Sequence, residues 1–168
     1  SSVTPAHIFF NEKNLNNYNT FFKIKPPLRT DEDRKGIIAG LKDGTIDCIA
    51  TNHYPHSIED KEKDILNAPF GMLGLETAFS VVYTILKKNG MSDFDIIKLF
   101  TSKPSKLIGL NSINLEEGAI ANFTVLDLKR EWIVNKKDIF SKSFNTPFLN
   151  HKLDGYVYAT ICKDNICM

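Results

Sequence analysis

The chain has 168 residues, 42% of them hydrophobic and 24% charged, which is enough for one ordinary domain with a buried core. Its formal net charge of +1 argues against a dedicated nucleic-acid surface, because neutralising phosphates requires clustered lysine and arginine. No stretch approaches the roughly 18 consecutive apolar residues of a membrane-spanning helix, so we expect no contact with a membrane.

In chain order, the first part of the sequence predicts two β-α steps. We expect a strand over 3–10, a polar loop or short helix over 11–19, an extended segment over 23–29, a helix over 30–44 and a buried strand over 45–51. Pro26 and Pro27 exclude a helix from the extended segment. Thr30 and Asp33 have the spacing of a capping box, and Gly44 is typical of a helix end.

The second part predicts helices followed by strands. We expect an exposed loop over 57–67, helices over 75–89, 92–101 and 104–109, and strands over 121–128, 132–134, 156–162 and 166–168. The β-α steps indicate a parallel layer, and the last strands indicate a separate small sheet. Two parallel strands leave unpaired edges, so we expect the rest of the layer to precede this sequence.

The cysteines favour a reducing compartment. Cys48, Cys162 and Cys167 have no metal-binding spacing. Cys48 lies in an apolar run, where a thiol behaves as a small hydrophobic side chain. Cys162 and Cys167 flank a predicted hairpin and could pair, but we favour the reduced state. The first residues also lack a signal-peptide pattern, so we expect a cytoplasmic protein.

Polar side chains gather where the strand over 45–51 ends. Asn52, His53 and His56 follow it directly, and Pro55 stiffens the loop between the two histidines. In α/β proteins the carboxyl ends of parallel strands carry the chemistry. Asn52 stands where a hydrolase would need a carboxylate.

Five sequence blocks appear in an order that resembles one known family. They are VTP-x-H over 3–7, K-x-x-PPLR over 23–29, DGTID-x-IAT-x-H-x-PH over 43–56, APFG-x-x-GLET over 68–77 and SKS-x-NTPF over 141–148. Together they resemble the C-terminal portion of class I dihydroorotases, in the amidohydrolase superfamily. The resemblance implies an α/β fold. Residues 1–110 would form about the last two β/α units of a (β/α)8 TIM-type barrel, and 111–168 the strands of a small β-sandwich.

The resemblance also implies an activity. Class I dihydroorotases are zinc-dependent hydrolases that interconvert dihydroorotate and N-carbamoyl-L-aspartate in de novo pyrimidine biosynthesis. Relatives with similar motifs act on hydantoins, dihydropyrimidines or allantoin, so other cyclic amides stay open. The family's remaining metal ligands precede Ser1, and we therefore expect zinc not to bind this chain alone.

Five residues take roles by this resemblance. Asn52 occupies the position of an aspartate that binds metal and moves the proton of the attacking water. Lys25, His56, Phe70 and Gly71 occupy substrate-binding positions. Lys25 and His56 could instead be solvent-exposed loop residues. For Asn52 three interpretations stay open: natural loss of catalysis, a deliberate substitution, or a variant that uses another base.

For the remaining polar and aromatic candidates we expect structural positions rather than contact with substrate. We expect hydrogen bonds from His53, a position behind the site for His7, an acidic partner for Arg29, a surface location for His151, and Trp132 and Phe148 in the core of the sandwich.

We expect the isolated chain to be catalytically inactive. An alternative is a non-catalytic subunit that scaffolds aspartate transcarbamoylase, a complementary barrel half or a homo-oligomer, because unpaired strand edges and apolar helix faces need a partner.

Overall fold

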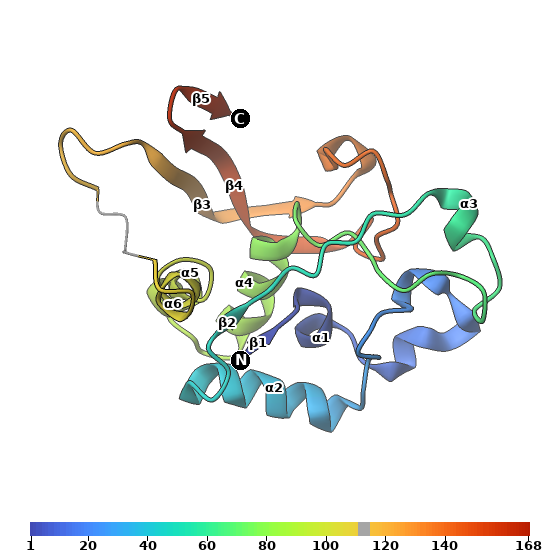
Figure 1. Ribbon diagram of the computed structural model, residues 1–168. Coiled ribbons are helices and arrows are strands. Elements are labelled where there is room, and N and C mark those ends of the chain that lie inside the picture. Colours follow the sequence, from blue (N-terminus) through green and yellow to red (C-terminus); the bar gives the residue numbers. More distant parts are fainter. Residues whose placement is uncertain (111–114) are drawn as a thin grey trace.

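The computed structural model describes residues 1–110 and 115–168, which form an α/β structure (Figure 1). The α-helices are α1 (Pro5–Phe9), α2 (Asp31–Asp43), α3 (Ile58–Lys61), α4 (Ala78–Lys88), α5 (Asp93–Lys98) and α6 (Ser102–Leu107). The strands are β1 (Ser2–Val3), β2 (Cys48–Ile49), β3 (Asn122–Ile133), β4 (Lys152–Cys162) and β5 (Asn165–Cys167), and 3-10 helices lie at η1 (Glu12–Tyr18), η2 (Thr20–Phe22) and η3 (Lys136–Asp138). The predicted domain boundary at 110/111 adjoins residues 111–114, which are outside the described ranges.

The strands form two separate sheets, as expected. β1 and β2 pair in parallel, with Ser2 opposite Cys48 and Val3 opposite Ile49. β3, β4 and β5 form an antiparallel sheet in that order. In the part of the chain that the structure describes, neither β1 nor β2 has a second strand beside it, so both outer edges of the parallel pair are open.

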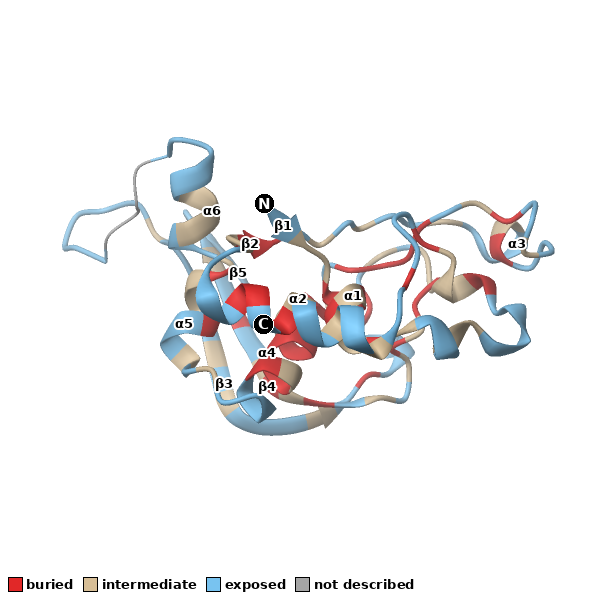
Figure 2. Cartoon of the chain, turned by 90° about the horizontal axis from the view of Figure 1, so that it is seen from below, coloured by how far each residue is buried: buried red, intermediate tan, exposed pale blue. Residues whose placement is uncertain are grey.

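Helix α4 is the centre of the packing. It lies between β4 on one side and α1 on the other, and α1 packs in turn on α2 (Figure 1). Figure 2 shows buried residues along α4 and on the adjoining parts of α1 and α2. Val82 and Leu86 of α4 join Ile8 and Leu41 in one apolar cluster, and Val81 joins a second. Burial of side chains of this size contributes about 1.5–3 kcal/mol each, so α4 holds the layers together.

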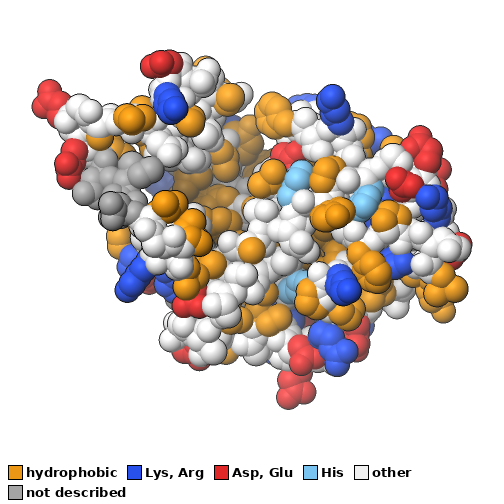
Figure 3. Space-filling model, viewed as in Figure 1, with side chains coloured by type: hydrophobic (Ala, Val, Ile, Leu, Met, Phe, Trp, Pro, Cys, Tyr) orange, Lys and Arg blue, Asp and Glu red, His pale blue; other side chains and the backbone are white. Residues whose placement is uncertain are grey.

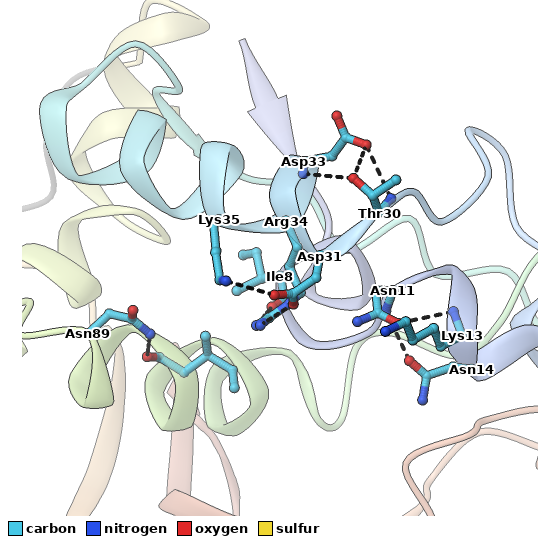
Figure 4. Close-up of polar contacts among 11 residues, drawn as sticks. Ile8, Asn11, Lys13, Asn14, Thr30, Asp31, Asp33, Arg34, Lys35 and Asn89 are labelled. Carbon is cyan, nitrogen blue, oxygen red and sulfur yellow. Dashed lines mark hydrogen bonds and ion pairs between the residues drawn. The ribbon is translucent and has the colours of Figure 1, made fainter.

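The N-terminus of α2 follows its predicted capping chemistry (Figure 4). The Asp33 amide donates to Thr30 Oγ1 over 3.1 Å, and the Thr30 amide donates to Asp33 Oδ2 over 3.1 Å. Arg34 then donates to Asp31 Oδ1 over 2.7 Å and to the Ile8 carbonyl over 3.4 Å. Gly44 ends the helix at a φ of +87°, which glycine adopts without strain. These bonds fix the orientation of α2 against α1.

The strand predicted over 3–10 is wrong beyond Val3. The segment Pro5–Phe9 is helix α1, capped by Thr4, whose Oγ1 accepts from the His7 amide over 3.4 Å. Pro5 occupies the first turn, where its missing N–H costs nothing and its fixed φ suits a helix. Local capping therefore outweighed the β propensity of the apolar residues that follow.

Several other predicted elements differ from the observed ones in their bounds or type. Strand β2 is Cys48–Ile49 rather than 45–51, because its partner β1 offers only two residues. The two strands predicted over 121–128 and 132–134 are one strand, β3, with a register shift between Asp127 and Glu131. The loop predicted over 57–67 contains the short helix α3, and Lys61 within it is buried.

Strand β4 begins at Lys152, earlier than its predicted start at 156, and Gly155 lies within it. Gly155 has a φ of +76°, and the residues on both sides of it, Asp154 and Tyr156, still pair with β3. A Cβ at this position would lie 2.8 Å from Tyr83 Cδ1, so the strand approaches α4 at this glycine. The Gly155 carbonyl accepts from Ser80 Oγ over 2.5 Å and from Trp132 Nε1 over 3.2 Å. Trp132 is half-buried here, and Phe148 lies in one apolar cluster with Trp132 of β3, Leu153 of β4 and Phe10.

We predict that Gly155→Ala destabilises the chain by about 2 kcal/mol, because it adds both backbone strain and a steric clash with α4. Gly36→Ala is the control. Gly36 lies inside α2 with open space around its Cα, and alanine there should stabilise by about 0.5–1 kcal/mol. Urea unfolding followed by circular dichroism measures both changes; equal midpoints for the two variants would contradict the prediction.

Candidate functional site at the carboxyl end of β2

The candidate site begins where β2 ends and the backbone turns sharply. Asn52 has a φ of +47°, a left-handed conformation that asparagine tolerates better than most residues, and its side chain is exposed. Gly74 passes directly beside this turn, and a Cβ on it would lie 2.4 Å from the Thr51 carbonyl oxygen. The returning segment can therefore lie against β2 only because residue 74 is glycine.

His53 ties the turn to that returning segment, as expected for a hydrogen-bonding histidine. Its Nδ1 accepts from the amides of Gly74 and Leu75, over 3.2 and 3.3 Å. The Tyr54 amide donates to the Met72 carbonyl over 2.8 Å, which continues the same contact. Because Nδ1 accepts two N–H groups, it carries no proton, and the ring is in its Nε2–H form.

The structure brings together three of the predicted site residues. His56 Nε2 donates to the Phe70 carbonyl over 2.9 Å, and Gly71 follows directly. Gly71 has a φ of +129°, and a Cβ there would lie 2.6 Å from Tyr54 Cβ. The ring of Phe70 is 51% exposed, so this corner has an accessible aromatic face.

The other two predicted site residues are both exposed. Lys25 is exposed on the segment between η2 and α2, and Asn52 is exposed at the β2 turn. Lys25 precedes Pro26, whose carbonyl bonds His7 Nε2 over 3.0 Å. His7 Nδ1 lies 2.6 Å from Thr4 Oγ1, and burial lowers the pKa of His7. His7 thus supports the segment that carries Lys25, and its predicted place behind the site stays a prediction.

Arg29 has the acidic partner that was predicted, but His151 is not at the predicted surface location. Arg29 Nε lies 4.0 Å from Asp33 Oδ2 at an exposed position, which confirms an acidic partner. The surface location predicted for His151 is wrong: it is half-buried, with its ring edge-on to Phe9 and Phe10 at 5.3 and 5.7 Å. Burial lowers the pKa of His151.

Asn145 is a residue of the site that sequence reasoning missed. Its side chain is fully buried and joins both loops. Oδ1 accepts from the His56 amide over 3.1 Å, and Nδ2 donates to the carbonyls of Tyr54 and Gly71 over 3.0 and 3.4 Å. Its own carbonyl accepts from the Leu73 amide over 3.1 Å. The block over 141–148 contained this residue, but nothing in its local pattern reveals partners so far away in the sequence.

A second missed feature is the buried cation Lys61. Its side chain is 2% exposed, and Nζ donates to the carbonyls of Pro69 and Gly71 over 2.9 and 3.0 Å. Burial, reinforced by the positive charge of Lys23, lowers the pKa of Lys61 to about 8. The loop that carries Phe70 is therefore held by an amine whose pKa burial lowers far below that of an exposed lysine.

The residues of this corner do not fit a metal centre by themselves. Within 1–110 and 115–168, no three histidine, cysteine, aspartate or glutamate side chains lie close enough to hold a metal ion. Asn52 offers one neutral amide oxygen, which is a weak ligand. His53 Nδ1 and His56 Nε2 are both engaged by backbone groups.

A large groove opens beside the site, between α4–α5 and the antiparallel sheet. It has a volume of about 670 Å³, and aromatic side chains line much of it, including Phe79, Phe100 and Trp132. Figure 3 shows a hollow with many hydrophobic side chains on its walls. Thr51 at the end of β2 also lines it. Glu76 in its wall accepts from the Ser141 amide through Oε1, over 2.9 Å, whereas Oε2 is buried with no partner in the described structure.

Comparison with known proteins gives consistent matches. Residues 7–167 match the model of the amidohydrolase family. A dihydroorotase of Staphylococcus epidermidis is 39% identical over 167 residues, which is 99% of this chain but 39% of that relative. The L-hydantoinase (dihydropyrimidinase) from Arthrobacter aurescens superposes with a TM-score of 0.86 at 26% identity, covering 98% of this chain and 38% of that one. This chain therefore spans well under half the length of the relatives it matches.

One further structure is similar in fold. It is the inactive dihydroorotase-like domain of the Chaetomium thermophilum CAD-like multifunctional protein, with a TM-score of 0.69 and 16% identity. The alignment covers 98% of this chain and 42% of that one. In addition, none of the helices within the described ranges is long and apolar enough to cross a membrane.

We predict that Asn145→Ala destabilises the chain by about 2–4 kcal/mol, because the Tyr54 carbonyl and the His56 amide lose the partner that Asn145 provides and the Gly71 carbonyl keeps only Lys61. Asn135→Ala is the matched control. Asn135 Nδ2 also donates to a carbonyl, that of Ile133 over 2.6 Å, but at an exposed position where water replaces it. Thermal and urea unfolding measure both, and an Asn145→Ala chain as stable as the control would contradict the prediction.

We predict that the stability contributed by Lys61 rises with pH. Between about pH 8 and 10.5 the folded chain binds fewer protons at this amine than the unfolded chain does. The unsubstituted chain should therefore gain about 2 kcal/mol relative to Lys61→Met between pH 7 and pH 10. Urea unfolding at both values measures it. Lys63→Met, at an exposed lysine, should show no such pH-dependent difference, and a constant difference for Lys61→Met would refute the assignment.

Proposed function

The chain belongs to the amidohydrolase family, and from that premise we propose that it supplies the C-terminal part of a dihydroorotase-type cyclic amide hydrolase. The reaction would be the interconversion of dihydroorotate and N-carbamoyl-L-aspartate in de novo pyrimidine biosynthesis. The observation that carries the proposal is the 39% identity to a dihydroorotase along 99% of the chain. The corner formed by His56, Phe70 and Gly71 supports it, since these are the substrate-binding positions that the family resemblance predicts.

The fold detail belongs to the same proposal. We propose that β1 and β2 are neighbouring strands of a (β/α)8 barrel, within residues 1–110. The antiparallel sheet of 111–168 would belong to a small β-sandwich. Parallel pairing of β1 with β2 and the superposition on the L-hydantoinase support this arrangement. The open edges of β1 and β2 would then pair with barrel strands that this chain does not contain.

The proposed roles of the site residues follow from their chemistry. Lys25 is exposed and positively charged, and would attract the carboxylate of dihydroorotate. His56 donates through Nε2 to Phe70, which leaves Nδ1 to accept a hydrogen bond from a substrate N–H. The exposed ring of Phe70 would cover the substrate ring. The Gly71 amide is already engaged by the Lys23 carbonyl over 2.9 Å, so Gly71 would contribute close approach rather than its N–H.

Asn52 sets the limit of what this chain can do. A carboxylate there could take a proton from the attacking water and return it to the leaving nitrogen, whereas a carboxamide cannot. Members of the amidohydrolase family are generally metal-dependent, and the zinc of a working enzyme would be held mostly by residues outside this chain. We therefore propose that the chain alone is inactive.

We predict that Asn52→Asp raises dihydroorotate turnover at least about 100-fold in a completed barrel and not in the isolated chain. The assay compares this chain alone with the chain co-expressed with the N-terminal part of the Staphylococcus epidermidis relative. Zinc content and turnover are measured for Asn52 and Asn52→Asp in both settings. Asn52→Gln controls for the change of side chain without a proton acceptor. Turnover by the isolated, unsubstituted chain would overturn the proposal.

A second function is favoured by the apolar groove and by the likeness in fold to an inactive dihydroorotase-like domain. In it, the chain is a non-catalytic subunit that scaffolds a complementary barrel half, a second copy or aspartate transcarbamoylase. The groove presents unpaired aromatic surface that such a partner would cover. Size-exclusion chromatography with light scattering discriminates, since a stable monomer would count against this function.

The cellular setting completes the proposal. We propose a cytoplasmic protein that acts on a small molecule rather than on nucleic acid. Three free cysteines support the cytoplasmic location, one buried in β2 and two exposed on the β4–β5 hairpin. The L-hydantoinase similarity leaves hydantoins as alternative substrates. Calorimetric titration of the completed barrel with dihydroorotate and with hydantoin would separate the two.

A further inference from the structure

Two lysine side chains hold the backbone of the loop over 66–71. Lys61 Nζ donates to the carbonyls of Pro69 and Gly71, as described above. Lys23 Nζ donates to the carbonyls of Leu66 and Ala68, over 3.0 and 2.6 Å. Four carbonyl oxygens of one short loop therefore point at two ammonium groups.

Both lysines are themselves fixed to neighbouring elements. The Lys61 carbonyl accepts a hydrogen bond from Thr20 Oγ1 of η2, so α3 is joined to η2 at this residue. The Lys23 carbonyl accepts from the Gly71 amide, and Lys23 Nζ lies 4.6 Å from the centre of the Phe70 ring. The loop is thus held from both sides, through its carbonyls, one amide and one aromatic ring.

Burying the ammonium group of Lys61 costs more free energy than burying an apolar side chain in the same place would. Lys61 is almost completely buried, and among the described residues it has no carboxylate partner. An ammonium group buried against carbonyls keeps a desolvation cost that a well-packed apolar side chain would avoid. Charge-assisted hydrogen bonds are, however, short and directional, so they fix the positions of backbone carbonyls more narrowly than apolar packing does.

The loop that they fix carries the candidate site. The Phe70 carbonyl, between the lysine-bound carbonyls of Pro69 and Gly71, is the acceptor for His56 Nε2. The Gly71 carbonyl is shared between Lys61 and Asn145, which also holds the His56 amide. Displacing this loop would therefore move both the aromatic face and the imidazole.

We propose that Lys61 and Lys23 are positioning residues of the candidate site, which hold the 66–71 loop so that Phe70 and His56 keep their mutual geometry. The significance of that geometry for substrate rests on the proposed function. Neither lysine is assigned a contact with substrate or a step in the reaction.

The test uses the full chain without ligand and the substitutions Lys61→Met and Lys23→Met. Methionine keeps the length of the side chain and removes the ammonium group. Lys63→Met is the control, because Lys63 is exposed and pairs with Asp60 outside the loop, over 2.7 Å. Hydrogen exchange is followed at the Gly71 amide and at α4 amides, and nitrogen NMR reports the hydrogen-bonding state of His56 Nε2.

We expect at least tenfold faster exchange at Gly71 in both variants, unchanged exchange in α4, and a shift of the His56 Nε2 signal. Unchanged exchange at Gly71, or equal acceleration in α4, would overturn the proposal. An unchanged His56 Nε2 signal together with faster exchange at Gly71 would also overturn the proposal. Lys23 is only half-buried, so Lys23→Met provides a folded variant should Lys61→Met fail to fold. Because no substrate is present, failure of the chain to bind dihydroorotate would count against the proposed function and not against this inference.

Discussion

The buried amide of Asn145 imposes the constraint on which the candidate site depends. One side chain has to satisfy the His56 amide and the carbonyls of Tyr54 and Gly71, three backbone groups from two different loops. A buried backbone group without a partner costs about 1–3 kcal/mol, so the Asn145 amide stabilises the two loops in their positions together with Lys61, which also holds the Gly71 carbonyl. Asn145 lies in the segment between η3 and β4, and β4 packs on α4. The site is therefore assembled by the whole chain rather than by the β2 motif alone.

The parts of the fold that were predictable are those decided by short-range chemistry. Helix α2 follows from the Thr30–Asp33 capping box and from Gly44, and all the groups involved lie within one helix. Helix α4 follows from a long apolar stretch. The prediction for 3–10 failed because capping by Thr4 and Pro5 opposed the apolar pattern that follows them. The length of β2 could not be read from its own residues, since it is set by how many residues β1 offers for pairing.

In the candidate site, too, some features could be predicted from the sequence and others depend on contacts between distant segments. The family resemblance gave His56, Phe70 and Gly71 a shared substrate-binding role, and the 2.9 Å hydrogen bond shows that His56 and Phe70 lie together. Lys61 could not be recognised, because a lysine in an acidic and basic stretch has the composition of an exposed loop. Its burial arises from η2, which is distant in sequence, and from the 66–71 loop, whose return onto Lys61 no local pattern reveals. Substrate roles for Lys25 and Asn52 stay predictions, and both side chains are exposed.

The smallness of the β1–β2 pair has a consequence for the order in which the molecule folds. Its two residue pairs join segments that lie far apart in the chain, so closing that loop costs conformational entropy that so few hydrogen bonds do not offset. Contacts of α4 with α1 and β4 are more extensive, and they would form the nucleus to which β1 and β2 are added late. The amides at the end of β2 should accordingly be among the last to become protected during refolding, later than those of α4. The candidate site at such a late-forming position would become ordered only after the remainder of the chain has folded.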